Sequence, residues 1–256
     1  MRQFSFLTLL LVSLLAIAAY GQAAPSSAAD YCKRGAERRN TGDYDGAIGD
    51  FTKAIEIDPR YKAAYTGRAN ARWNKHKRLP ADIDGGLADL TKAIELDPRD
   101  GHVYWDRGKM RWFEKHDMDG AIADYTKAIE IIPSNFVLYM ERGNIRFDKG
   151  DFEKSVADYD RSIKLQPRDN YAYEGRGNAR RANGDLHGAV ADYDKAIEIE
   201  PHNASIYAHR GLAKLKLGKD AEAQTDIDTA LKMDSSLKTE VDLQIRNIKQ
   251  VRKPKQ

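Results

Sequence analysis

Two columns of oppositely charged residues are the most regular chemical feature of the chain. An arginine and, further along, an aspartate recur together with a period of about 34 residues. The arginines are Arg34, Arg68, Arg107, Arg142, Arg176 and Arg210, and the aspartates are Asp50, Asp89, Asp124, Asp158, Asp192 and Asp226. Because a lone buried charge is costly, six cations matched by six anions predict a structural ladder of ion pairs. The alternative is an arginine stripe that binds phosphate or an acidic peptide.

A second basic column follows four residues after the first. Its members are Arg38, Arg72, Arg111, Arg146, Arg180 and Lys214. No acidic column matches it as clearly in the sequence. We expect these side chains either to lie along the helices with their charged ends in water or to make one face of the protein positive.

No set of residues suited to catalysis or to metal binding stands out. The six histidines are scattered through the repeats without helical spacing to an acid or a cysteine, whereas a metal site needs clustered ligands. No glycine-rich phosphate loop precedes a helix, and no strand pattern is present to hold a nucleophile. The sequence therefore predicts a protein that is not an enzyme and has no cofactor and no metal.

The element that positions both charged columns is a repeated pair of helices. Five near-identical blocks, such as KAIEIDP and KAIEIEP, each end in a proline, which stops a helix because it lacks a backbone donor. These prolines are Pro59, Pro98, Pro133, Pro167 and Pro201. Within a block, a Gly-Asp pair such as Gly150-Asp151 ends one helix and caps the next. Asp82 and Asp117 are expected to cap in the same way.

Further columns of small and bulky residues indicate how the helices pack. A tyrosine precedes each arginine of the first column by three residues, and a small residue follows it, as with Tyr139 and Gly143. In the second helix, a small residue is followed four places later by a bulky one, as with Ala189 and Tyr193. Small residues let helices approach closely, and the bulky ones fill the remaining gaps.

This pattern resembles the tetratricopeptide repeat (TPR), a helix-turn-helix unit of about 34 residues. The resemblance covers roughly residues 28–235 and implies an all-α, right-handed α-solenoid of six TPR-like helical hairpins. The predicted repeats are residues 28–61, 62–100, 101–135, 136–169, 170–203 and 204–237. The sequence departs from the family at the second turn, where about five residues are inserted around His76 to Ala81. It also carries arginine where the family has an apolar residue in the first helix.

The two ends of the chain have a different composition. Residues 1–23 have the order of a secretory signal peptide, which predicts an exported protein, periplasmic or secreted; an uncleaved membrane anchor is the alternative. After removal of the signal, no membrane association is expected. Residues 238–251 are predicted to form a capping helix, with a partner-binding helix as the alternative, and residues 252–256 a basic tail.

The overall charge argues against a polyanion as the partner. The chain has 42 Lys and Arg against 39 Asp and Glu, so its net charge is only +3. A balanced surface of this kind is typical of ion-paired helices, and no nucleic-acid binding is expected. Cys32 is the only cysteine, which excludes a disulfide within the chain.

The resemblance to TPR proteins implies that the first helices line a concave groove in which a peptide lies. Asparagine has a donor and an acceptor, so a row of such side chains can hold the backbone of an extended peptide. The predicted groove residues are Asn70, Trp73, Trp105, Lys109, Trp112, Asn144, Phe147 and Asn178. The alternatives are that the aromatic side chains pack between hairpins and that the asparagines are ordinary polar surface.

These features predict a non-enzymatic scaffold that binds a protein or an extended peptide. Two alternatives remain: a self-associating subunit of an envelope or secretion complex, and a binder of an anionic envelope polymer. Some family members bind an acidic peptide terminus through paired Lys and Asn in their first two repeats. Ala36 and Thr66 do not supply that arrangement here, so recognition of an acidic terminus is not expected.

Overall fold

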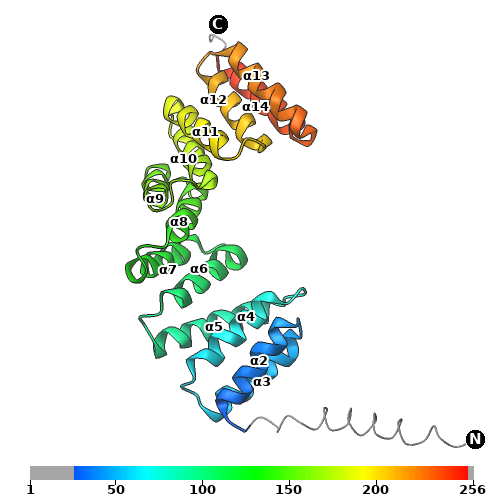
Figure 1. Cartoon of the computed structure of the whole chain (residues 1–256), viewed down its shortest axis with the longest axis vertical. Coiled ribbons are helices and arrows are strands. Elements are labelled where there is room, and N and C mark those ends of the chain that lie inside the picture. The colour runs from blue at the N-terminus through cyan, green and yellow to red at the C-terminus, as the bar shows by residue number, and fades with distance from the viewer. Residues whose placement is uncertain (1–25, 253–256) are drawn as a thin grey trace, which may run out of the picture. The chain divides into compact units, whose positions relative to one another are not determined.

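The computed structural model describes residues 26–252, and these residues form thirteen α-helices and one short 3-10 helix (Figure 1). They divide into two compact units with a boundary between Leu96 and Asp97. The first unit contains α2 (Ala28–Asn40), α3 (Tyr44–Ile57), α4 (Lys62–Asn74) and α5 (Pro80–Leu96). The second contains α6 (Gly101–Lys115), α7 (Met118–Ile131), α8 (Phe136–Asp148), α9 (Phe152–Leu165), α10 (Asn170–Ala182), α11 (Leu186–Ile199), α12 (Ala204–Lys216), α13 (Asp220–Met233), η1 (Ser235–Leu237) and α14 (Lys238–Arg252).

The helices pack in consecutive antiparallel pairs. Two hairpins, α2/α3 and α4/α5, make up the first unit, and four, from α6/α7 to α12/α13, make up most of the second. The predicted all-α array of helical hairpins is therefore confirmed.

The turns inside the hairpins follow from glycine and aspartate. Gly42, Gly150, Gly184 and Gly218 have φ between 81° and 89°, a left-handed conformation in which a Cβ atom would be strained. In the third hairpin His116 takes this conformation instead, with φ 52°. Asp43, Asp117 and Asp185 then cap the following helix by accepting a backbone N–H three residues on.

Two of the predicted caps differ in the structure. Asp151 precedes α9, but its side chain accepts no capping hydrogen bond. Asp82 lies in the first turn of α5, where its carboxylate accepts the N–H of Leu79 at 3.0 Å. The five inserted residues shift the start of α5 to Pro80, and so the aspartate falls inside the helix.

The core lies between the two helices of each hairpin and continues to the next hairpin in the same unit. Phe51, Tyr125, Tyr159 and Tyr193 are at most 2% exposed. Their rings lie directly against the small residues of the first helices. A Cβ atom on Gly177 would lie 2.7 Å from Cε1 of Tyr193, so any larger residue at that position would have to displace the ring.

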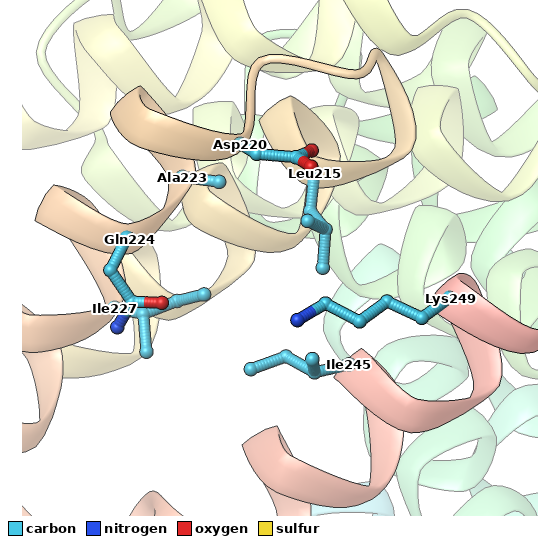
Figure 2. Close-up of a pocket in the computed structure, with 7 residues that line it drawn as sticks. All are labelled: Leu215, Asp220, Ala223, Gln224, Ile227, Ile245 and Lys249. Atoms are coloured by element: carbon cyan, nitrogen blue, oxygen red, sulfur yellow. The ribbon is translucent and has the colours of Figure 1, made fainter. Parts of the chain in front are cut away.

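Helix α14 covers the end of the last hairpin. Val241 and Ile248 are buried against α12 and α13, and Arg252 donates to the Leu215 carbonyl at 3.0 Å. Arg252 is thus part of the helix rather than of the predicted tail, whose other residues lie outside the described ones. A cavity of about 60 Å³ remains between α12, α13 and α14, with the amino group of Lys249 turned toward it (Figure 2). It has room for a few water molecules only.

The predicted signal peptide, residues 1–23, lies outside the described residues. No helix between residues 26 and 252 has both the length and the apolar composition needed to cross a membrane.

Candidate interaction surface

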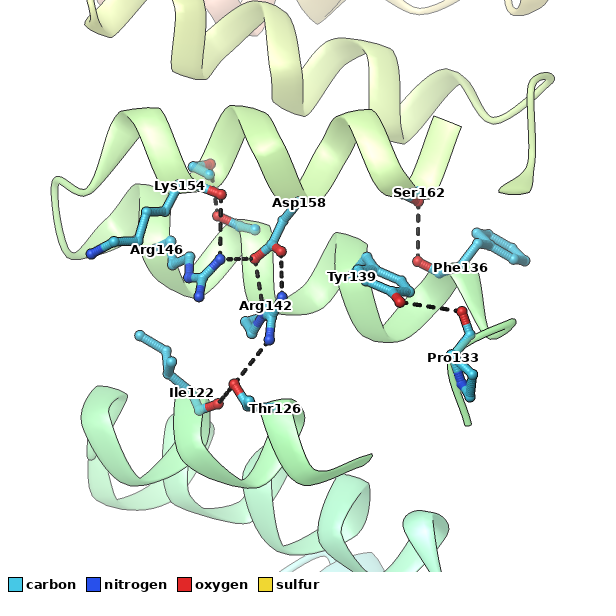
Figure 3. A network of polar contacts seen from close by, with 12 residues as sticks. Ile122, Thr126, Pro133, Phe136, Tyr139, Arg142, Arg146, Lys154, Asp158 and Ser162 are labelled. Atoms are coloured by element: carbon cyan, nitrogen blue, oxygen red, sulfur yellow. Dashed lines mark hydrogen bonds and ion pairs between the residues drawn. The ribbon is translucent and has the colours of Figure 1, made fainter. Parts of the chain in front are cut away.

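Each arginine of the first column forms a bidentate ion pair with one buried aspartate on the second helix of its own hairpin. Arg142 on α8 donates from Nε and Nη2 to Asp158 on α9, at 3.0 and 2.6 Å (Figure 3). Asp158 is only 3% exposed. The same bidentate pairing joins Arg68 to Asp89, Arg107 to Asp124, Arg176 to Asp192, Arg210 to Asp226 and Arg34 to Asp50. Such bidentate pairs are the strongest class of charged hydrogen bond.

The second basic column pairs with the same aspartates, which the sequence analysis missed. Arg146 Nη1 lies 2.8 Å from Oδ2 of Asp158, so this carboxylate is held by two guanidinium groups (Figure 3). The equivalent pairs are Arg38–Asp50, Arg72–Asp89, Arg111–Asp124, Arg180–Asp192 and Lys214–Asp226. The sequence showed no clear acidic match for this column because each aspartate is shared by two cations. Each hairpin encloses two cations and one anion.

Four arginines of the first column also contact the preceding hairpin of their own unit: Arg68, Arg142, Arg176 and Arg210. Nη1 of Arg142 donates to the Thr126 hydroxyl of α7 at 2.9 Å, and Nη1 of Arg176 donates to Asp160 of α9 at 2.5 Å. Each guanidinium also lies 5.2 to 5.9 Å from the ring of the tyrosine one turn earlier, a cation–π arrangement. Each guanidinium group of this column is therefore paired with a carboxylate, and the column does not present a row of unpaired guanidinium groups to an anion.

A further set of equivalent positions, which we call the Asn column, lies two residues after each arginine of the first column. It consists of Ala36, Asn70, Lys109, Asn144, Asn178 and Leu212. In α8 and α10 a buried tyrosine of the same hairpin sets the direction of the amide. Tyr159 donates its hydroxyl to Oδ1 of Asn144, and Tyr193 donates to Oδ1 of Asn178 at 2.8 Å. The amide oxygen is thus held inward, which leaves the NH2 group as the outer donor.

The other two polar members of the Asn column have different surroundings. Leu90 stands in the second hairpin where Tyr159 and Tyr193 stand in theirs, so Asn70 has no hydroxyl to orient it. Lys109 pairs with Asp106 at 3.0 Å, and its Nζ lies 4.9 Å from the centre of the Trp105 ring. The four polar members therefore do not form one uniform row of amides.

The predicted aromatic residues pack partly into the core. Trp105 and Trp112 lie against the apolar cluster of the α6–α8 region, and Trp105 Nε1 donates to Glu141 at 2.5 Å. Glu141 also accepts the Tyr125 hydroxyl at 2.7 Å. This matches the alternative in which the aromatics contribute to packing between neighbouring hairpins.

Two aromatic contacts modify the surface further. Phe113, which the sequence analysis did not single out, is 52% exposed and stacks on Trp112 with ring centres 4.5 Å apart. Its position beside a tryptophan at the end of a first helix was the available signal. Phe147 lies half-buried against the cluster around Tyr159, 5.6 Å from the Phe152 ring.

The predicted groove residues fall in both compact units. Asn70 and Trp73 belong to α4 in the first unit, where the Arg78 guanidinium lies 5.1 Å from the centre of the Trp73 ring. The remaining residues lie in the second unit on α6, α8 and α10. The second unit thus contains both tyrosine-oriented asparagines. Near them, burial raises the pKa of the Asp148 carboxyl at the end of α8.

No metal centre accompanies this surface. Across residues 26–252, His, Cys, Asp and Glu side chains do not gather in groups of three or more that could hold a metal ion. Cys32 is a free thiol, and burial raises its pKa.

Comparison with known protein families explains the repeated geometry. The profile described as TPR repeat matches residues 143–180 and 177–218, and the one described as tetratricopeptide repeat matches residues 31–61 and 204–237. Residues 31–61 and 143–237 therefore match tetratricopeptide repeats. Three pairs of the ladder lie within the matched residues: Arg34–Asp50, Arg176–Asp192 and Arg210–Asp226. No curated protein matches the full sequence significantly.

Several solved structures share the fold at low sequence identity. One of these is the crystal structure of a MamA protein, whose sequence is 24% identical to this chain. The match has a TM-score of 0.62 and covers 68% of this chain and 92% of the MamA chain. YrrB, described as a TPR protein with an unusual peptide-binding site, is 20% identical over 78% of this chain and 97% of its own, with a TM-score of 0.64. PilW, described as a widely conserved type IV pilus biogenesis factor, is 17% identical over 86% and 99%, with a TM-score of 0.65.

Proposed function

We propose that this TPR protein is a non-enzymatic scaffold that binds a protein or an extended peptide along its first helices. The observation that carries the proposal is the pair of amides held by Tyr159 and Tyr193. Fixing the oxygens of Asn144 and Asn178 leaves two NH2 groups at equivalent positions of neighbouring hairpins. Neither NH2 group has an acceptor among the described hydrogen bonds.

The chemistry of these amides suits a backbone ligand. An extended peptide offers carbonyl oxygens at regular intervals, and donors fixed in advance lose little conformational entropy when they bind them. Exposed Phe113 and the edge of Trp112 add an aromatic surface of the kind that anchors a partner's side chain. Peptide binding by YrrB, stated in its description, supports the same use of the fold.

Binding of an anionic polymer through the arginine columns has less support. Both basic columns are engaged with buried aspartates, and the first-column arginines of the second unit are at most 17% exposed. A polymer would have to compete with bidentate pairs that are already formed. Assembly into an envelope or secretion complex stays a prediction, as does self-association.

The test of the groove uses a display library of extended peptides and the intact chain. We expect the double variant Asn144→Ala/Asn178→Ala to lose affinity for the selected peptides by about tenfold or more, since two hydrogen bonds are removed. Gln224→Ala, an exposed amide on the second helix α13, is the matched control and should bind normally. Unchanged binding by the double variant would refute the proposed surface, as would equal losses in the control.

Trp112→Ala tests the aromatic part of the same surface. We expect weaker peptide capture with no change in self-association, because the removed ring lies on a first helix. Circular dichroism after the substitution checks that the hairpin still folds, since Trp112 also contacts the core.

We also propose that the chain is exported, on the basis of the charge and apolar order of residues 1–23. Cell fractionation combined with N-terminal sequencing of the mature protein tests this. Retention of Met1 in the cytoplasm would contradict it.

A further inference from the structure

The charge pattern of the second helices is broken in the fourth hairpin. In four other hairpins, the last turn of the second helix holds a lysine and a glutamate three residues apart that form an ion pair, as Lys195 and Glu198 do at 2.6 Å. Helix α9 carries Arg161 and Lys164 at the same two positions. Neither of these side chains makes an ion pair or a hydrogen bond with another described residue. The last turn of α9 therefore presents two cations without an acid.

The neighbouring residues add to this positive charge. Glu200 follows the last turn of α11, whereas Gln166 stands at the equivalent position after α9. Arg168 comes next, in the α9–α10 loop, and is exposed, as are Arg161 and Lys164. The helix dipole favours a cation near the C-terminal end of a helix, but four other second helices have glutamate at this position, so the fold does not require one. We call Arg161, Lys164 and Arg168 the basic edge.

The charged side chains become acidic at the next loops of the same unit. A pocket of about 520 Å³ lies among the starts of α10 and α12, the α11–α12 loop and the end of α13. Its two carboxylates are those of Glu200 and Asp234, and no lysine or arginine is among the described residues that line it. Within residues 26–252, Glu200 makes no ion pair, and the Asp234 carboxylate accepts the backbone N–H of Ser236 at 2.9 Å. We call Glu200 and Asp234 the acidic edge.

Exposed apolar side chains adjoin both charged parts. Tyr171 and Met233 line the same pocket as the acidic edge and are 65% and 44% exposed. Tyr171 follows Arg168 by only three residues, which places it beside the basic edge as well. Arg168 also lines a neighbouring pocket of about 330 Å³, together with Ile199 of α11. Large exposed apolar groups bordered by charged side chains are typical of protein–protein interfaces.

A basic part and an acidic part on one side of the molecule suit a second copy of the chain. In a two-fold dimer the same surface of both copies meets, so the basic edge of each copy can lie on the acidic edge of the other. A partner with a single sign of charge would be attracted by one part and repelled by the other. Two copies related by a two-fold axis satisfy both parts at once.

We propose that the chain forms a two-fold dimer through this surface, with the basic edge of each copy against the acidic edge of the other. The exposed Tyr171 side chains lie where the basic and acidic parts adjoin, and they pack together between the two sets of ion pairs. This interface is separate from the Asn column, because it uses the ends of second helices and the loops between hairpins. Peptide binding and dimer formation can therefore be measured independently.

The first test is the oligomeric state of the intact chain, measured by analytical ultracentrifugation over a range of protein concentrations. We expect a concentration-dependent dimer whose dissociation constant rises by about tenfold or more at high salt, because salt screens exposed charge pairs. A chain that stays monomeric at every concentration overturns the proposal, even if the basic edge then binds an acidic polymer. A dimer that is insensitive to salt overturns it as well.

A charge exchange assigns the interface to its residues. Lys164→Glu gives α9 the glutamate that four other hairpins have at this position, so folding should be unaffected. This variant and Glu200→Lys should each weaken the dimer by about tenfold or more, because each puts like charges together at two places. An equimolar mixture of the two variants should dimerise again, as should the double variant Lys164→Glu/Glu200→Lys. A mixture that stays monomeric overturns the interface.

The matched controls lie at the other end of α9. Lys154→Glu and Glu153→Lys make the same changes of charge on exposed side chains of that helix and should dimerise like the unaltered chain. Equal losses in these controls would show that net charge, and not the proposed surface, governs association. Peptide binding that depends on Asn144 and Asn178 should be unchanged in Lys164→Glu, so the dimer and the proposed function can fail separately.

Discussion

The ion-pair ladder and the Asn column lie two residues apart on the same helices, yet they behave oppositely along the chain. The ladder has the same arginine, aspartate and second cation in each hairpin, except that Lys214 replaces arginine in the last. The Asn column changes from alanine to asparagine, lysine and leucine.

The difference has a physical cause. A ladder arginine faces an aspartate of its own hairpin and a tyrosine ring of its own helix, so every repeat presents it with these two partners. For a residue of the Asn column, the fold constrains only the side that faces the protein interior. The regular column therefore maintains the array, and the irregular one is free to differ for recognition.

The largest effect is expected from breaking the ladder. Asp158→Ala leaves Arg142 and Arg146 together without their carboxylate, and removal of one partner from a buried charged group costs about 3 to 5 kcal/mol. Urea unfolding of the intact chain measures the loss. Glu153→Gln, an exposed acid on the same helix α9, should change the unfolding midpoint little; similar losses in both variants would contradict a special role for Asp158.

High pH tests the buried tyrosines of the second helices. Burial raises the pKa of Tyr193 from 10.0 to about 12 and also raises the pKa values of Tyr125 and Tyr159. The folded chain holds these protons more tightly, so the stabilisation is complete below pH 10 and is lost as pH rises from 10 to 12. Tyr193 alone contributes about 2 to 3 kcal/mol to this loss.

Unfolding midpoints between pH 9 and pH 12, with absorbance at 295 nm to follow tyrosine ionisation, measure this effect. Tyr193→Phe should lose less stability over this interval than the unaltered chain. An identical pH profile for the two proteins would show that Tyr193 is not protected by burial.

A matched pair of glycine substitutions tests how closely the columns are packed. Gly177→Ala places a methyl group 2.7 Å from the Tyr193 ring, and we expect it to destabilise the chain by about 1 to 3 kcal/mol. Gly49→Ala has no neighbour within 4 Å and should stabilise its helix by about 0.5 to 1 kcal/mol. Thermal unfolding of both variants should therefore shift in opposite directions, and shifts of the same sign would contradict the packing argument.

Removing the tyrosine hydroxyl separates recognition from stability. Tyr193→Phe leaves the ring in place, and Phe51 already occupies the equivalent position in the first hairpin, so we expect a loss of about 1 kcal/mol at neutral pH. Peptide affinity should fall by several-fold, because Asn178 is no longer oriented. Equal affinity for the two proteins would show that the hydroxyl does not prepare the amide.

The smallest effect is expected on the outer surface of the second helices. Lys195 pairs with Glu198 at 2.6 Å, but both side chains are more than half exposed. Exposed pairs of this kind contribute little, so Lys195→Ala should leave both the melting temperature and peptide binding unchanged. A clear loss would mean that charge periodicity alone does not distinguish structural pairs from surface pairs.

Much of the architecture could be read from the chain because the same local pattern is repeated. The prolines and the Gly-Asp turns predicted the hairpins, since each such residue restricts its own backbone. Six arginines equivalent to Arg142 and six aspartates equivalent to Asp158 predicted that these residues form ion pairs. Asp82 was wrongly predicted to cap α5. The inserted residues move the start of the helix to Pro80, and the residues around Asp82 carry no sign of that shift.

Periodicity by itself determined the all-α hairpin array, the positions of the charged columns and the location of the Asn column on the first helices. Only the tertiary structure decided that Arg146 shares the aspartate of Arg142 and that Tyr159 and Tyr193 orient their asparagines. The physical reason is that a repeat specifies which residues recur on a helix. The distance between two packed helices then decides which side chains reach each other and which are left for a partner.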